Sequence, residues 1–300
     1  MARSNIRFAG TVIAHGILWV GLFTPEARAQ FWEVTSLGGF NTHDINNSGQ
    51  VLLDTSGFGS HSFVFDTVNG LVDLGTLGGN QTEVFRSDIN NLGQVAGTSQ
   101  LSSGEFHAFL WDRLNGMEDL GTLGGVHSVA YGINDSGQAV GYSETASGDF
   151  VPFLWDSVNG MRNLGISGTA YAINSSGQVV GTGGPDGRAF LWDSVNGVRY
   201  LNGANTQAVD INDLGQVTGV ANNTDQAFVW DSVNGLRDVN IGTLQEAGNG
   251  INNSGYVVGT YQFEPSNDGP LHAFLWNNGV ASDIHPDGLP SSAANAVNDS

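Results

Sequence analysis

The chain has 300 residues, with nine Lys and Arg side chains against 29 Asp and Glu, so its formal net charge is −20 at pH 7. This charge repels the phosphate backbone of nucleic acids and anionic membrane surfaces, and we expect neither as a partner. The absence of cysteine excludes disulfides, thiolate catalysis and cysteine-based zinc sites.

The first 29 residues have the features of a secretory signal peptide. Arg3 and Arg7 give a basic start, residues 8–23 are mostly apolar, and Ala27-Arg28-Ala29 fits a cleavage site before Gln30. The apolar run is short for a membrane span. We therefore expect a secreted or cell-surface protein whose mature chain begins at Gln30 and contains no membrane span, with a retained anchor as the alternative.

After residue 30, a phrase of the form Asn-x-x-Gly recurs at nearly constant spacing. Its first residue is Asn46, Asn90, Asn134, Asn174, Asn212 or Asn252, and a seventh copy begins at Asn298. A period of this size indicates one supersecondary unit stacked on copies of itself. We expect residues 30–300 to form a single domain of six complete repeats plus a partial seventh. Because the phrase stops at Ser300, we also expect the natural chain to continue.

The turn residues predict four short strands in each repeat. Asn-x-x-Gly suits a tight turn that ends in a glycine with positive φ, and Asn-Gly pairs such as 69–70 and 115–116 predict a second hairpin. A Phe-Leu-Trp run and an Asp-Leu-Gly run supply the remaining strands. No segment after residue 30 has a sustained helical period, so the sequence predicts an all-β fold.

The Phe-Leu-Trp strand indicates how the repeats pack. Phe109 and Trp111 point to one face of the strand, whereas Ala108 and Leu110 point to the other. Both faces are apolar, which predicts a sheet covered on both sides. We expect a β-propeller of about six to seven four-stranded blades, with an open β-repeat array as the alternative. The equivalent aromatic residues are interpreted as core between blades rather than exposed platforms for sugar stacking: Trp111, Trp155, Trp192, Trp230 and Trp276.

The two ends of the repeat region are complementary. Residues 31–39 align with the last strand of a repeat, and residues 296–300 align with the first. The sequence therefore predicts that one blade is built from both ends of the chain.

The order of these motifs resembles a known family. His107-Ala108-Phe109 and His272-Ala273-Phe274, set between Asn-x-x-Gly and Asp-Leu-Gly motifs, are similar to the bacterial extracellular repeat family named for His-Ala-Phe. The resemblance covers the chain from about residue 31. It implies an exported, propeller-like protein, often with a C-terminal surface-sorting segment, and no established enzymatic activity. The histidine is replaced by Val151, Arg188 or Gln226 in other copies, so a shared catalytic or ligand role for it is not expected.

The residues that could support chemistry are mostly explained by turns. Asp44 and Asp210 begin sequences that resemble the start of a calcium loop, but the bidentate acid at the loop end is absent. We expect Asx-type turns there and no cofactor, with calcium kept as an alternative. The aspartates after each Trp are expected to cap their own turns: Asp112, Asp156, Asp193 and Asp231. The histidines have no metal-ligand spacing.

The acids that break the repeat pattern lie in the variable linkers. They are Glu83, Glu105, Glu144, Asp149, Asp186, Asp225, Glu246 and Glu264. Loops on a rigid scaffold commonly carry function, so the sequence directs attention to them. We expect a secreted, non-catalytic scaffold that binds an extracellular ligand, either a polysaccharide or a surface protein. A polysaccharide-active glycosidase or lyase and a calcium-dependent adhesion module are the alternatives.

Overall fold

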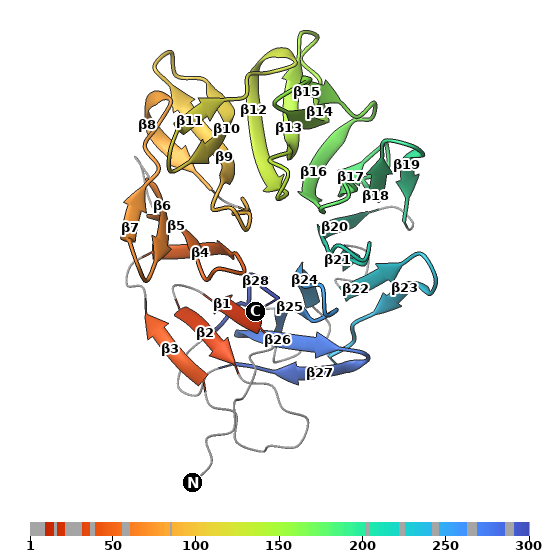
Figure 1. Ribbon diagram of the computed structural model, residues 1–300. Helices are drawn as coiled ribbons and strands as arrows, with labels where there is room; N and C mark the ends of the chain where they lie inside the picture. The colour runs from red at the N-terminus through yellow and green to blue at the C-terminus, as the bar shows by residue number, and fades with distance from the viewer. Residues whose placement is uncertain are drawn as a thin grey trace.

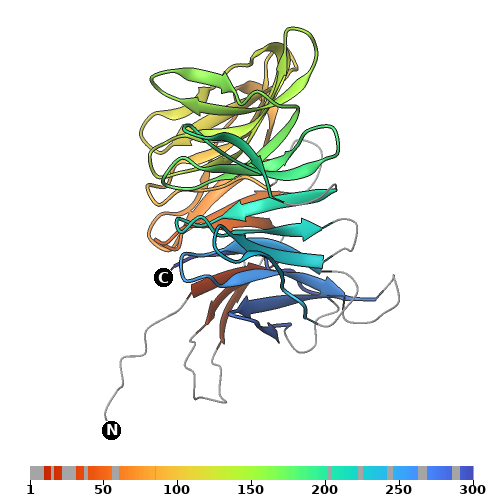
Figure 2. The same ribbon diagram turned by 90° about the vertical axis from the view of Figure 1, so that its right-hand side faces the viewer.

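The computed structural model describes residues 10–14, 17–21, 32–36, 40–55, 61–84, 86–201, 205–221, 226–241, 246–262, 269–285 and 291–299. Every regular element within these ranges is a β-strand, and the strands form seven four-stranded antiparallel sheets. The sheets are arranged as the blades of a propeller around a central channel (Figure 1), and Figure 2 shows the same blades from the side. The prediction of an all-β propeller is confirmed.

Six blades are each made by one continuous segment of chain. The first strand lies nearest the channel in five of them (Figure 1), whereas in blade 2 the channel is lined by residues 86–89, which follow the first strand. Blade 1 contains β4 (Phe40–Ile45), β5 (Val51–Thr55), β6 (Ser62–Asp66) and β7 (Gly70–Asp73). Blade 2 contains β8 (Gly78–Glu83), β9 (Val95–Leu101), β10 (Phe106–Asp112) and β11 (Gly116–Asp119). Blade 3 contains β12 (Gly124–Ile133), β13 (Ala139–Thr145), β14 (Phe150–Asp156) and β15 (Gly160–Asn163). Blade 4 contains β16 (Gly168–Ile173), β17 (Val179–Gly183), β18 (Arg188–Asp193) and β19 (Gly197–Tyr200). Blade 5 contains β20 (Thr206–Ile211), β21 (Val217–Ala221), β22 (Gln226–Asp231) and β23 (Gly235–Asp238). Blade 6 contains β24 (Glu246–Ile251), β25 (Val257–Gln262), β26 (Leu271–Asn277) and β27 (Val280–Asp283).

The seventh sheet, here called the closing sheet, is built from both ends of the chain, as the sequence predicts. Its order is β28 (Ala296–Val297), β1 (Gly10–Ala14), β2 (Ile17–Gly21) and β3 (Trp32–Ser36). The junction of the two ends is the pairing of Val12 with Val297 and of Ile13 with Ala296. Strand β28 also lies beside the inner strands β24 and β4, so the ring is closed.

The closing sheet includes strands from the segment expected to be a signal peptide. Strands β1 and β2 fall within the first 29 residues, whereas Ala27, Ala29 and Gln30 lie outside the described residues. Cleavage before Gln30 therefore stays a prediction. A chain cleaved there would lack β1 and β2, the strands to which β28 and β3 are hydrogen-bonded.

The predicted turns form as expected. In the first repeat, the N–H of Gly49 donates to the carbonyl of Asn46 at 3.0 Å, and Gly49 has a φ of +76°. This conformation favours glycine because it lacks a Cβ. At the second turn, the Asp112 carboxylate accepts the N–H groups of Leu114 and Asn115. The same capping occurs at Asp156, Asp193 and Asp231, which confirms the interpretation of these acids.

The strand that contains Phe109 and Trp111 is covered on both faces. Phe109 and Trp111 cluster with Leu52 and other apolar residues of blade 1, and Ala108 and Leu110 cluster with residues of blade 3. The equivalent tryptophans stand opposite the first residue of the neighbouring strand in every blade that has one. Trp111, Trp155, Trp230 and Trp276 are buried, with 4–7% of their surface exposed, and Trp192 is half-buried. None of these five is an exposed platform.

Candidate functional site in the central channel

Seven asparagine side chains join the blades into a ring at one end of the channel. Asn46 Nδ2 donates to the carbonyl oxygen of Asn90 at 2.8 Å, and Asn298 Nδ2 donates to the carbonyl oxygen of Asn46 at 3.0 Å. Five equivalent bonds connect Asn90, Asn134, Asn174, Asn212, Asn252 and Asn298 in order. The repeated asparagine is therefore used to hold neighbouring blades together, and every one of these side chains is buried.

The histidine of the His-Ala-Phe motif is also bound within the scaffold. His61 Nδ1 lies 2.9 Å from an Asp73 carboxylate oxygen, and His107 Nδ1 lies 2.8 Å from Asp119. His272 makes the same cross-strand pair with Asp283 at 3.1 Å. The motif histidine thus links the third and fourth strands of its blade, consistent with its absence from other copies.

A bulge in the inner strand aims unrepeated side chains at the channel. The pairing of the first two strands shifts register three residues before the ring asparagine in five blades, at His43, Tyr131, Tyr171, Val209 and Asn249. A bulge leaves one residue unpaired and changes the direction of nearby side chains. The backbone bulge is the same in these blades, but the residue at this position differs in almost every one. The position therefore presents different side chains to the channel from blade to blade.

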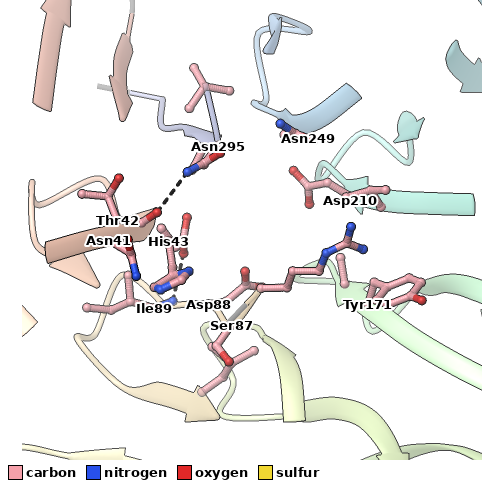
Figure 3. A pocket seen from close by; sticks show the side chains of 18 of the residues that line it. Asn41, Thr42, His43, Ser87, Asp88, Ile89, Tyr171, Asp210, Asn249 and Asn295 are labelled. Atoms are coloured by element: carbon pink, nitrogen blue, oxygen red, sulfur yellow. Dashed lines mark hydrogen bonds between the residues drawn. The ribbon is translucent and has the colours of Figure 1, made fainter. Parts of the chain in front are cut away.

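A cavity of about 620 Å³ lies in the channel, on the side of the asparagine ring where these bulges occur. Its lining includes Asp44, Asp88 and Asp210, each two residues before a ring asparagine. Figure 3 shows Asp88, Asp210, His43 and Tyr171 approaching the cavity from different blades. Gly132, Ala172, Gly250 and Ala296 occupy the aspartate position in the other copies. The carboxylates are therefore not a requirement of the repeat.

Each of the three carboxylates accepts a hydrogen bond from a backbone N–H group of the next blade along the chain. Asp44 accepts the N–H of Ile89 at 2.9 Å, Asp88 that of Ile133, and Asp210 that of Ile251 at 2.8 Å. These bonds favour the ionised carboxylate, but burial opposes it more strongly.

The resulting pKa values are raised. Burial raises the pKa of Asp44 and raises that of Asp210 to about 6. Burial, followed by the charges of Asp44 and Asp210, raises the pKa of Asp88 well above its ordinary range. The cavity is consequently less negative near neutral pH than three free carboxylates would make it.

Other polar groups complete the wall of the cavity. Asn295 Nδ2 donates to the carbonyl of Thr42 at 3.0 Å, and Asn249 Nδ2 donates to that of Ala294 at 2.9 Å. The Arg86 guanidinium lies 5.8 Å from the centroid of the Tyr171 ring. Amides, carboxylates, a guanidinium and a phenol can bind hydroxyl groups as both donors and acceptors.

The described part of the chain contains no group of three or more His, Asp or Glu side chains placed to hold a metal ion. The Asx-type turn expected in the phrase that begins at Asp44 is confirmed: Asn46 forms it, and its Oδ1 accepts the N–H groups of Ser48 and Gln50 at 3.0 Å. A calcium requirement stays an untested alternative. No described segment forms a helix with the length and apolarity to cross a membrane.

The structure does not gather the linker acids into one site. Glu105 is bound by Ser103, Asp186 pairs with Arg188, and Glu246 accepts the N–H of Ile241. Asp149 accepts the hydroxyl of Ser147, and Asp225 and Glu264 lie outside the described residues. The interpretation that the linker acids mark the site is therefore not supported by their positions.

From the sequence, Asp44 and Asp210 are considered only as the start of a calcium loop, and their sharing of a cavity with Asp88 is not predicted, because all three sit inside the repeated phrase. Asp44, Asp88 and Asp210 resemble ordinary turn residues when each copy is read alone. The available signal was their occurrence in only three of the seven copies, at a position where the other copies have Gly or Ala.

Comparison with known proteins supports the fold alone. No family model matches the chain, and no curated protein sequence does either. Among solved structures, TolB from Acinetobacter baumannii is 14% identical with a TM-score of 0.56, covering 96% of this chain and 81% of TolB. The β-propeller domain of the Trilobed protease from Pyrococcus furiosus is 11% identical with a TM-score of 0.57, covering 93% and 94%.

A Mycobacterium tuberculosis puromycin-hydrolyzing peptidase is 11% identical, with a TM-score of 0.59 over 96% of this chain and 54% of the peptidase. Similarity at this level of identity establishes a common propeller architecture and carries no activity across.

Proposed function

We propose that the chain is a secreted, non-catalytic propeller that binds an extracellular polysaccharide or surface protein at the mouth of the cavity. The observation that supports this proposal is that repeated and unrepeated residues have different roles. The repeated Asn, Asp and His side chains are occupied in blade contacts and turns, whereas unrepeated side chains from several blades line the cavity. Convergent polar groups in a concave site are the usual form of a binding site.

The signal-peptide pattern before Gln30 and the resemblance to the His-Ala-Phe repeat family support an extracellular role. The high negative charge favours neutral or cationic ligands over anionic ones. The absence of catalysis is part of the proposal.

Binding can be tested with substitutions that the repeats themselves supply. The triple variant Asp44→Ala, Asp88→Ala and Asp210→Ala puts into three blades the residue found at Ala172 and Ala296. The probes are immobilised mannan, xyloglucan, chitosan, alginate and extracted surface proteins. We expect the triple variant to lose binding to every probe that the parent chain binds. Circular dichroism checks that the variant still folds.

A matched control lies at the opposite end of the channel. Asp135 and Asp213 occupy the position of Asn91 and Asn253, so Asp135→Asn and Asp213→Asn change charge without altering the repeat pattern. We expect the control to bind like the parent chain. Equal binding by both variants, or no binding by the parent chain, would contradict the proposal.

The second candidate function is a polysaccharide-active enzyme acting in the same cavity. The specific observation that favours it is the raised pKa of Asp88 next to the carboxylates of Asp44 and Asp210. Perturbed carboxylates in a cavity are typical of glycoside hydrolysis. Release of reducing sugars from any panel member, abolished by Asp88→Asn in a folded protein, would establish this alternative. We expect no release.

A further inference from the structure

A row of four aromatic side chains, here called the aromatic row, runs from the cavity toward the rim of the propeller. It consists of Tyr171, Tyr131, Tyr142 and Phe150. The ring centroids of Tyr171 and Tyr131 are 5.6 Å apart, those of Tyr131 and Tyr142 are 6.1 Å apart, and those of Tyr142 and Phe150 are 5.6 Å apart. Tyr171 also lines the cavity, so the row and the cavity are continuous.

The row follows the boundary between blades 3 and 4. Tyr131, Tyr142 and Phe150 come from the first three strands of blade 3, and Tyr171 comes from the inner strand of blade 4. Below it, Leu154 of blade 3 packs against Ala170 and other apolar residues of blade 4. The three tyrosines are half-buried, and 49% of the Phe150 surface is exposed.

The repeat does not require these rings. The position of Tyr142 is occupied by Thr98, Thr182 and Thr260 in blades 2, 4 and 6. The position of Tyr131 is occupied by a histidine, a serine, a valine or an asparagine in other blades, and by tyrosine again only at Tyr171. Four rings in one contiguous line are thus a feature of a single blade boundary rather than of the architecture.

Charges of both signs lie beside the tyrosines of the row. The Arg86 guanidinium lies near the Tyr171 ring. Glu83 is close enough for its charge to contribute to raising the pKa of Tyr142, after burial, and burial raises that of Tyr131 to about 12. The phenols of Tyr131 and Tyr142 therefore stay neutral donors at physiological pH. Because the charges of Arg86 and Glu83 oppose one another at the tyrosines, this part of the row does not favour a strongly charged ligand.

We propose that the aromatic row is an extended subsite for a neutral, linear polysaccharide chain, one end of which enters the cavity. This inference rests on the proposed function and specifies its ligand. The spacing of the row is comparable with the length of a sugar ring. Neighbouring rings are tilted by 45° to 79°, so successive sugars can place their apolar C–H faces against a ring face at some positions and against a ring edge at others. Aromatic side chains combine large apolar area with polar tips, and the phenols here can bind sugar hydroxyls.

The test measures binding of cellohexaose, mannohexaose and xylohexaose, and of the matching trisaccharides, by isothermal titration calorimetry. The variant is Tyr142→Thr combined with Phe150→Ala, and the full chain is used throughout. The control is Leu271→Ala, because Leu271 occupies the position of Phe150 in blade 6 and has a similar exposed fraction of 46%. Loss of ring stacking is expected to weaken hexasaccharide binding about threefold to tenfold per ring removed.

We expect the variant to lose affinity for at least one hexasaccharide, to discriminate less between hexasaccharide and trisaccharide, and to retain the thermal stability of the control. If the row variant binds like the parent chain while the triple cavity variant does not, the subsite is wrong and the proposed function stands. If no neutral hexasaccharide binds but the row residues are needed to bind polygalacturonate or a lysine-rich peptide, the ligand class is wrong. If the parent chain binds none of these probes or the broader panel, both proposals fail.

Discussion

The raised pKa of Asp210 predicts a pH-dependent destabilisation that a single substitution should remove. The ordinary aspartate pKa of 3.8 is raised to about 6 in the folded protein because burial in the channel disfavours the charge. A group with a raised folded pKa contributes most to stability below about pH 4, and this contribution is lost as the pH rises through about 6. The Asp210→Ala substitution should therefore abolish part of the decline in stability between these values.

The magnitude follows from the size of the shift. Raising a pKa from 3.8 to about 6 is worth roughly 3 kcal/mol, and solvent in the channel reduces this to about 2 kcal/mol because Asp210 is half-buried. The variant also loses the hydrogen bonds from Ile211 and Ile251 at every pH. The informative quantity is consequently the change with pH in the stability difference between parent and variant, rather than its value at one pH.

Urea unfolding monitored by tryptophan fluorescence at pH 4, 5, 6, 7 and 8 measures this quantity. We expect the parent to lose about 2 kcal/mol relative to Asp210→Ala as the pH rises from 4 to 8. Asp156→Ala is the control, because hydrogen bonds from Asn159 lower the pKa of Asp156, so its contribution is lost only below about pH 4 and its stability difference should change little across this series. A pH-independent difference for Asp210→Ala would refute the reasoning.

Three further predictions concern the scaffold and export. Asn174→Ala removes a buried side chain that bonds Gln178 and the carbonyl of Asn212, and should lower the free energy of unfolding by about 3 kcal/mol in urea titrations; a loss below about 1 kcal/mol would contradict a structural ring. Trp155→Ala should lower it by about 3–5 kcal/mol, and wild-type stability would show that this tryptophan is not core. Amino-terminal sequencing of secreted protein should begin at Gln30, whereas membrane-bound chains that retain Met1 would refute export by cleavage.

The sequence predicts the architecture well because each repeat contains the same turn and strand signals. Each turn at an Asn-x-x-Gly phrase is specified locally, since only glycine readily adopts the φ of +76° found at Gly49. The burial of Phe109 between blades follows from the apolar character of both faces of its strand. Agreement between local turn chemistry and strand patterning in six copies left few alternatives.

The site could not be predicted in the same way, because it depends on which copies face one another. Asp44 and Asp88 are 44 residues apart and Asp210 is far from both in sequence, yet the ring directs all three into one cavity. The raised pKa of Asp88 arises from burial and from the charges of Asp44 and Asp210, and neither exists in an isolated repeat.

The sequence by itself determined the strands of the repeats after residue 30, the two turns of each blade, the buried Phe and Trp positions and the contribution of both chain ends to one sheet. It did not predict strands β1 and β2, which lie in the segment expected to be a signal peptide. Only the tertiary structure decided that the ring asparagines close a continuous circle from Asn46 through Asn298, and that three aspartates and a line of aromatic rings share one mouth of the channel. Local propensity acts over a few residues, whereas closure of a propeller places side chains by the angle between blades, and that angle is set by packing over the whole ring.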